Sequence, residues 1–242
     1  PKTIDTNDIG DYELTLSGET STNNEFVYNG GVIKPVISFI KLNSNPPKTL
    51  TFDANYTYLK GNQTAISDYG GNPVNVGSYC IRVNITGDYP NQNYTGTVYL
   101  AYNIVKMSIE NNNLVTIDVN DSSLVYTGYN LSPSIAIKRN GKTYVDGSFV
   151  WQNNIDISSD FNFTYNTTHA NAGSHEVVIS AKDGTNFSGS VTKTFTIKQR
   201  SLADVSFEIE PQTFTGTKIT PIRDDITATL NAYILTADDF DF

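Results

Sequence analysis

The stretch TGTVYLAYNI, residues 95–104, alternates apolar side chains with smaller or more polar ones. Successive side chains of a β-strand point to opposite faces, so a period of two gathers the apolar set on one side. That set consists of Val98, Leu100, Tyr102 and Ile104. The alternation predicts a strand that buries one face.

A second stretch, SVTKTFTI at residues 190–197, has the same period, with threonines on the side opposite to its apolar residues. These apolar residues are Val191, Phe195 and Ile197. The two stretches belong to longer segments that align, because NYTGTVYLAYNIVK (93–106) corresponds to NFSGSVTKTFTIK (186–198). Upstream, NVGSYCIRVNI (75–85) corresponds to NAGSHEVVISA (171–181). The chain is therefore built from repeated segments.

A shorter motif, aromatic-x-Gly-x4-Pro, occurs three times, in FVYNGGVIKP (26–35), LVYTGYNLSP (124–133) and QTFTGTKITP (212–221). A single match would carry no information, because Gly and Pro are common turn residues. We expect the aromatic ring to pack into the core of a β-sandwich, the glycine to adopt a turn conformation that a Cβ would obstruct, and the proline to begin the next strand. The motif residues are Tyr28, Gly30 and Pro35; Tyr126, Gly128 and Pro133; and Phe214, Gly216 and Pro221.

The repeats predict three domains. Repeat 1 covers residues 1–106, repeat 2 covers 107–199, and 200–242 is expected to be the first half of a truncated repeat 3. Repeat 2 carries an extra stretch around YVDGSFVWQNN (144–154). A unit of about 100 residues has the usual size of one small all-β domain.

We expect an all-β fold in which each repeat forms a two-sheet antiparallel β-sandwich. No segment combines helical apolar spacing with helix-forming surface residues, whereas turn signals separate the alternating stretches. Asn140-Gly141 predicts a two-residue hairpin turn. Asp183-Gly184 predicts a longer connection between two strands. The alternative is a set of β-grasp-like repeats, which would require a helix.

Composition excludes several classes of function. The net charge is −9 and only 17% of residues are charged. Without a Lys/Arg cluster the chain cannot displace counterions from phosphates, so nucleic acid and anionic membrane surfaces are not expected partners. No apolar run is long enough to span a bilayer as a helix.

The composite of the repeat resembles the tandem MBG-like and Ig-like repeats of bacterial cell-surface proteins, particularly large Gram-positive adhesins. Besides the motif above, it contains DANYTY (53–58) and DFNFTY (160–165), and it closes with TFTIK (194–198). The likeness covers nearly all of residues 10–242 and is carried by turn and core positions. It implies tandem Ig-like antiparallel β-sandwich domains in a secreted, surface-attached protein whose repeats act as stalk, spacer or adhesive modules.

One stretch is a candidate ligand platform. Trp151, the single tryptophan, lies near Tyr144 and Phe149 in the extra stretch of repeat 2. Flat rings cover the apolar faces of sugars, so these three side chains could bind glycan. A lone Trp in a sandwich can equally belong to the core. Both interpretations stay open.

No residues have the pattern of a catalytic or cofactor site. Cys80 is the only cysteine, and its counterpart in repeat 2 is Glu176, which favours a structural role. His169 and His175 are too few for a zinc site.

Acidic residues follow the linkers, at Asp5, Asp8, Glu110 and Asp204. They are candidates for Ca²⁺ ligands at domain junctions or for ordinary solvated charge. Lys106 and Lys198 stand at equivalent unit ends, where a Lys–Asn amide cross-link is one interpretation and a simple strand terminus is the other.

The sequence thus predicts a non-enzymatic, extracellular, cell-surface-attached bacterial segment that contacts its neighbouring repeats and a glycan or protein ligand of a host or the environment. The alternative is a carbohydrate-binding accessory module of a secreted polysaccharide-degrading enzyme. In that case Trp151 and surface tyrosines such as Tyr129 would contact the glycan.

Overall fold

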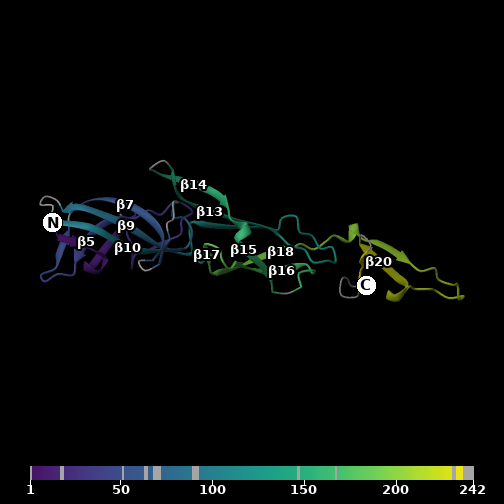
Figure 1. The fold of residues 1–242 in the computed structure, drawn as a ribbon. Coiled ribbons are helices and arrows are strands. Elements are labelled where there is room, and N and C mark those ends of the chain that lie inside the picture. Colours follow the sequence, from purple (N-terminus) through teal and green to yellow (C-terminus); the bar gives the residue numbers. More distant parts are fainter. Residues whose placement is uncertain are drawn as a thin grey trace. The chain divides into compact units, whose positions relative to one another are not determined.

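The computed structural model describes residues 2–16, 19–50, 52–62, 65–67, 72–88, 93–145, 148–166, 168–230 and 233–236. Within these ranges the chain forms β-strands and short 3₁₀ turns, without an α-helix (Figure 1). The expectation of an all-β fold is confirmed. The β-grasp alternative, which requires a helix, finds no support in this part of the chain.

The chain divides into two compact units, which are described separately. The first comprises Pro1–Val115, Arg139–Ile155 and Ala181–Gly189. The second comprises Thr116–Lys138, Asp156–Ser180 and Ser190–Phe242. The first unit therefore contains all of repeat 1 together with three segments of repeat 2.

Two β-sheets form the body of repeat 1. In spatial order, one sheet contains β1 (Lys2–Ile4), β10 (Tyr94–Val105), β9 (Gly77–Asp88), β7 (Phe52–Asn62) and β8 (Ala65–Ser67). A further strand, β4 (Glu25–Val27), also pairs with β10, and both β1 and β4 run parallel to it. The other sheet is antiparallel and contains β3 (Glu19–Thr20), β2 (Ile9–Leu16), β5 (Val36–Leu42) and β6 (Lys48–Leu50).

One hydrophobic core joins these two sheets, which makes repeat 1 sandwich-like. Leu14 and Ile40 come from the antiparallel sheet and Ile81 from the other, and all three are fully buried. The predicted apolar face of β10 is confirmed, since no member is more than 1% exposed: Val98, Leu100, Tyr102 and Ile104. Burying one such aliphatic side chain contributes about 1.5–3 kcal/mol, so this face anchors the sheet.

The remaining strands form small sheets. A parallel pair consists of β11 (Met107–Ser108) and β17 (Phe187–Ser188). A second sheet has the order β12 (Val115–Asn120), β13 (Ser134–Val145), β14 (Ser148–Asp156). A third has the order β15 (Phe161–Tyr165), β16 (Gly173–Ala181), β18 (Ser190–Ile197), and a fourth the order β19 (Ser206–Ile209), β20 (Ile226–Leu230), β21 (Tyr233–Ile234). The 3₁₀ turns are η1 (Thr6–Asp8), η2 (Ser158–Asp160), η3 (Leu202–Asp204) and η4 (Arg223–Asp225).

The predicted strand pair of repeat 2 is confirmed. Strands β16 and β18 are antiparallel, and the connection between them contains Gly184 at φ +75°. Phe195 and Ile197 are each 1% exposed, whereas the threonines of this strand are exposed: Thr192, Thr194 and Thr196. The Asp183-Gly184 signal therefore marked a true turn.

The hairpin predicted at Asn140-Gly141 is wrong. Strand β13 runs through both residues, and neither adopts the positive φ that the turn requires. Asn140 instead accepts a hydrogen bond from the Asn154 N–H at 2.9 Å. Gly141 is needed for close approach, because a Cβ there would lie 2.5 Å from Nη1 of Arg139.

Candidate functional site

The motif glycines have the predicted conformation. Gly30 has φ +75°, and Gly128 and Gly216 both have φ +82°, in the region that side chains with a Cβ disfavour. The prolines behave as predicted in two copies, since β5 begins directly after Pro35 and β13 directly after Pro133. The motif therefore sets a turn and the start of a strand.

The aromatic residue of the first copy does more than fill its own domain. Tyr28 packs against the core of repeat 1, as predicted. Its ring also meets Phe187 of repeat 2 edge to face, with ring centroids 5.6 Å apart and planes at 84°. Edge-to-face geometry is favourable for aromatic pairs. Tyr28 thus joins the two repeats within the first compact unit.

A buried cation lies beside this ring. Arg139 of β13 is only 3% exposed, and its guanidinium carbon lies 6.0 Å from the centre of the Tyr28 ring. Its Nη1 donates a hydrogen bond to the Asn29 carbonyl. Desolvation lowers the pKa of the guanidinium. A Cβ on Gly30 would overlap this guanidinium, so the motif glycine also makes room for the cation.

Asn186 ties the same region together through hydrogen bonds. Its side-chain Oδ1 accepts from the Val76 N–H at 2.8 Å, and its Nδ2 donates to Asn75 Oδ1 at 3.0 Å. Its main-chain carbonyl accepts from the Met107 N–H at 3.0 Å, which starts the β11–β17 pairing. One residue of repeat 2 therefore bonds to the loop before β9 and to the strand that follows β10.

The second copy of the motif behaves similarly within the second compact unit. Tyr126 packs against a small core of residues that follow repeat 2: Ala228, Leu230 and Leu235. Its N–H donates to the Lys198 carbonyl at 2.9 Å. In both copies the aromatic ring contacts residues of the next repeat.

The third copy departs from the prediction. Phe214 is 80% exposed, so it does not pack into a sandwich. The prediction placed the aromatic ring of every copy inside a sandwich. In the first two copies part of the cover comes from the following repeat, and Phe214 lacks such cover among the described residues.

The predicted glycan platform falls on a sheet of repeat 2. Tyr144 lies in β13, while Phe149 and Trp151 lie in β14, and the two strands are neighbours. The side chains of all three residues lie outside the part of the chain that the structure describes.

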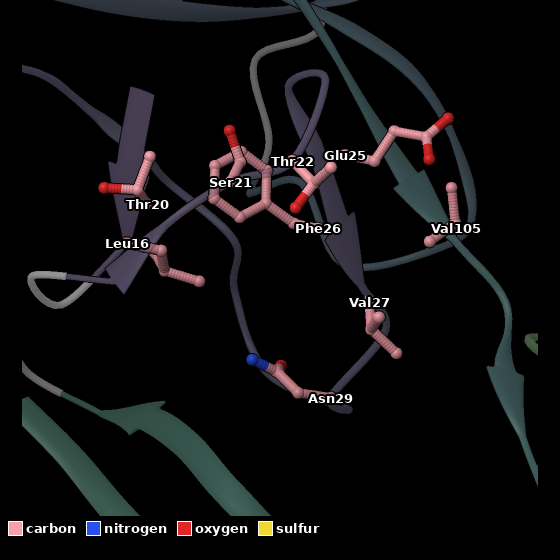
Figure 2. A pocket seen from close by; sticks show the side chains of 9 residues that line it. All are labelled: Leu16, Thr20, Ser21, Thr22, Glu25, Phe26, Val27, Asn29 and Val105. Carbon is pink, nitrogen blue, oxygen red and sulfur yellow. The ribbon is translucent and has the colours of Figure 1, made fainter. Parts of the chain in front are cut away.

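A cavity of about 440 Å³ in repeat 1 is a candidate that sequence reasoning missed (Figure 2). Among its lining groups, the Glu25 carboxylate and the hydroxyls of Thr20 and Thr22 are polar. Phe26 contributes little flat surface, because it is 7% exposed and its ring packs against Tyr102. The remaining lining residues are Leu16, Ser21, Val27, Asn29 and Val105. Eight of the nine lining residues lie within residues 16–29, and the ninth is Val105 of β10. The stretch FVYNGGVIKP overlaps this segment, but its pattern predicted a turn and not a cavity.

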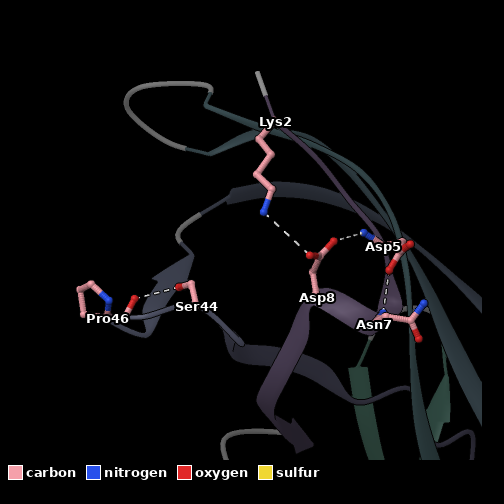
Figure 3. Close-up of polar contacts among 6 residues, drawn as sticks. All are labelled: Lys2, Asp5, Asn7, Asp8, Ser44 and Pro46. Carbon is pink, nitrogen blue, oxygen red and sulfur yellow. Dashed lines mark hydrogen bonds and ion pairs between the residues drawn. The ribbon is translucent and has the colours of Figure 1, made fainter.

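The acidic residues near the linkers have local partners. Figure 3 shows Asp5 accepting from the Asn7 N–H at 2.8 Å, and Asp8 accepting from the Asp5 N–H at 3.0 Å. Asp204 forms an ion pair with Arg200, with 3.3 Å between Oδ2 and Nε. Among the described residues no group of three or more His, Cys, Asp or Glu is arranged to hold a metal ion. The contacts of these carboxylates are those of caps and ion pairs.

Cys80 and the two histidines pack against other residues. Cys80 is fully buried, and desolvation raises the pKa of its thiol to about 11. Such a thiol holds little reactive thiolate at neutral pH. The His169 ring stacks on the Tyr165 ring, with centroids 4.3 Å apart. The centroids of the His175 and Phe195 rings lie 5.5 Å apart.

The two lysines considered for a cross-link are at the surface. Lys106 is exposed, and Lys198 Nζ donates to the Ser122 carbonyl at 2.8 Å. Amide formation requires the ammonium to face an amide side chain, so the contact of Lys198 does not favour a cross-link there.

In the ranges that the structure describes, no helix has the length and apolar character needed to cross a bilayer. No family model, curated protein or solved structure matches the chain.

Proposed function

We propose that this chain is a non-enzymatic, tandem-repeat segment of a secreted bacterial surface protein, with Ig-like units that serve as a stalk or spacer or as adhesion modules. The extracellular location rests on the family resemblance of the repeat. The contact between repeats 1 and 2 at the Tyr28 motif is the observation that carries the proposal. A spacer transmits position only if neighbouring units hold a fixed orientation.

The connection between the repeats supports this mechanical role. Strand β10 ends at Val105 and β11 begins at Met107, which leaves a single residue as linker. So short a linker permits little independent rotation. Three further contacts hold repeats 1 and 2 together: the ring contact of Tyr28, the packing of the buried Arg139, and the hydrogen bonds of Asn186.

The chemistry of the titratable residues supports a non-enzymatic role. The single cysteine is buried with a raised thiol pKa, and the histidines contribute to aromatic packing. Nucleophilic catalysis requires an accessible, activated group instead.

Backbone ¹⁵N relaxation on the chain at low concentration tests the spacer role. We expect the amides of β9 and β10 and those of β11 and β17 to report one common rotational correlation time. In the Asn186→Ala, Tyr28→Ala double variant the two sets should separate. Independent tumbling in the unmodified protein would remove the basis for a spacer.

The alternative function, a carbohydrate-binding accessory module, is favoured by one observation. The cavity at Glu25 has a volume within the range of small-ligand sites and brings together a carboxylate and hydroxyl groups. Glycan-array binding tests it with three proteins: the unmodified chain, Glu25→Gln and Trp151→Ala. Affinity lost in Glu25→Gln assigns binding to the cavity, and affinity lost in Trp151→Ala assigns it to the aromatic platform. The absence of any glycan affinity rejects this alternative.

A further inference from the structure

The dipeptide Asn-Gly occurs twice in the chain, and both copies lie beside the buried Arg139. Asn29-Gly30 belongs to the first copy of the motif, and Asn140-Gly141 directly follows Arg139. Asparagine loses its side-chain amide most readily before glycine, because no Cβ hinders attack by the glycine nitrogen on the asparagine side chain. The same reactive dipeptide is therefore present in two different surroundings.

At Asn29-Gly30 the attacking nitrogen is activated by a cation. Deamidation requires the Gly30 nitrogen to lose its proton and attack Cγ of Asn29. Arg139 Nη1 donates a hydrogen bond to the Asn29 carbonyl, which belongs to the same peptide group as the Gly30 nitrogen. The negative charge left on that peptide group is shared by the carbonyl oxygen, so a desolvated guanidinium stabilises it. Arg139 is 3% exposed and forms no ion pair with the residues that the structure describes. Within the same part of the chain, the Gly30 N–H donates no hydrogen bond that would have to break first.

The side-chain amide of Asn29 is activated and accessible as well. Its Oδ1 accepts a hydrogen bond from the Gly31 N–H at 2.8 Å. Attack on Cγ places negative charge on this oxygen, and a donor that is already in place stabilises that charge, as in an oxyanion hole. Asn29 also lines the cavity of about 440 Å³, and Figure 2 shows its amide directed toward that space. Water can therefore reach the side chain, and ammonia can leave it.

We propose that Asn29 is a site of spontaneous deamidation, which the fold accelerates through Arg139 and the Gly31 N–H. In the first step the Gly30 nitrogen forms a bond to Cγ of Asn29, the bond from Cγ to Nδ2 breaks, and ammonia leaves with the proton of the Gly30 nitrogen. This step gives a succinimide ring. Water then adds to one of the two ring carbonyls and opens the ring, which leaves aspartate or isoaspartate. Either product has a carboxylate on the residue that binds Arg139, so the modification changes the charge at the contact between repeats 1 and 2.

Asn140-Gly141 is a matched control within the same chain. Asn140 Oδ1 also accepts a main-chain hydrogen bond, from the Asn154 N–H at 2.9 Å, so the two side-chain amides are alike in this respect. The peptide groups differ. Strand β13 runs through Asn140 and Gly141 as the middle strand of its sheet, and the Asn140 N–H donates to the Leu114 carbonyl at 2.7 Å. Ring closure there would require the strand to leave its sheet, so the fold should slow deamidation of Asn140.

Peptide mapping by mass spectrometry, after incubation of the chain at neutral pH, measures deamidation at both sites. Aspartate and isoaspartate each weigh about 1 Da more than asparagine, and the succinimide weighs about 17 Da less. A parallel incubation in concentrated guanidinium chloride gives the two rates in the unfolded chain. We expect Asn29 to react faster in the folded chain than in the unfolded chain, and Asn140 to react more slowly. An Asn29 that reacts no faster in the folded chain would overturn the proposal.

Two variants assign the reaction to its parts. Arg139→Met removes the cation and keeps most of the side-chain volume. Deamidation of Asn29 should fall at least about tenfold in this variant, because the loss of one preorganised donor slows such reactions by that much or more. Asn29→Gln, whose longer side chain closes its ring far more slowly, should abolish the mass change in this peptide. An unchanged or faster rate at Asn29 in folded Arg139→Met would contradict the role of the cation. The comparison of folded and unfolded chain needs no variant, so it decides the proposal even where Arg139→Met does not fold.

Discussion

Tyr28 and Phe214 occupy the same position of the same motif, yet their surroundings differ. Tyr28 is half-buried between the core of repeat 1 and Phe187, whereas Phe214 is 80% exposed. The backbone at both sites is alike, since Gly30 has φ +75° and Gly216 has φ +82°. The local sequence therefore determines the turn, and the neighbouring repeat determines whether the ring is covered.

Tyr126 supports the same distinction from the second compact unit. Its ring packs against Ala228 and Leu230, which belong to the segment after repeat 2. We expect an aromatic residue that packs against two segments of the chain in this way to stabilise both of them.

The largest expected difference between the two sites is in stability. Tyr28→Ala should lower the free energy of unfolding by about 3 kcal/mol, because it removes a packed ring and leaves a cavity against Phe187. Phe214→Ala should change it by less than about 0.5 kcal/mol, as expected for an exposed position. Urea unfolding, followed by far-UV circular dichroism, measures both values. If both variants lost the same free energy of unfolding, the contact of Tyr28 with repeat 2 would contribute nothing to stability.

Alanine substitutions at the glycines of the first and third copies distinguish the energetic cost of backbone strain from that of steric crowding. Gly30→Ala and Gly216→Ala share the cost of a left-handed backbone, about 1 kcal/mol. Only the Gly30 variant also places a methyl group against the Arg139 guanidinium, which adds about 1–2 kcal/mol of overpacking. The melting temperature of Gly30→Ala should therefore fall further than that of Gly216→Ala. Identical melting temperatures would show that Arg139 moves aside freely.

The buried cation can be tested through two replacements of different size. Arg139→Ala should destabilise the chain by about 2 kcal/mol, since it removes packing against Tyr28 and the hydrogen bond to Asn29. Arg139→Met keeps most of the volume and avoids the desolvated charge, so its loss should be below about 1 kcal/mol. Chemical denaturation gives both values. A methionine variant as unstable as the alanine variant would assign the stabilisation to the charge itself.

The smallest expected effect concerns Asn186. Asn186→Ala removes the acceptor of the Val76 N–H, and a hydrogen bond of this kind contributes about 1 kcal/mol. Hydrogen exchange at the Val76 amide should accelerate about fivefold in this variant. Asn130→Ala, at an exposed position, is the control and should leave the Val76 amide unchanged. Exchange of Val76 that is already unprotected in the native chain would contradict the contact.

Much of the fold followed from local patterns in the sequence. Alternation predicted the buried face of β10, because side chains in a strand necessarily alternate between its two faces. The spacing of the motif predicted a positive φ at Gly30, and Asp183-Gly184 predicted the turn before β18. The same type of signal failed at Asn140-Gly141, where β13 continues through both residues and Asn140 Oδ1 accepts a hydrogen bond from the Asn154 N–H.

The contacts between repeats could not be predicted in the same way. Arg139 looks like an ordinary strand residue, and its burial depends on Tyr28 and Gly30, more than 100 residues away in sequence. Asn186 did carry a signal, since Asn93 occupies the equivalent place in repeat 1. The alignment showed that equivalence, but a side-chain bond to Val76 depends on how two repeats meet, which period and spacing do not encode.

A double-mutant cycle between Tyr28 and Phe187 tests the shared aromatic contact most directly. Urea unfolding of the unmodified chain, Tyr28→Leu, Phe187→Leu and the double variant, followed by the fluorescence of the single tryptophan, gives their coupling free energy. We expect a coupling of about 0.5–1.5 kcal/mol, as found for edge-to-face pairs. Additive losses, with a coupling indistinguishable from zero, would contradict the conclusion that the motif joins one repeat to the next.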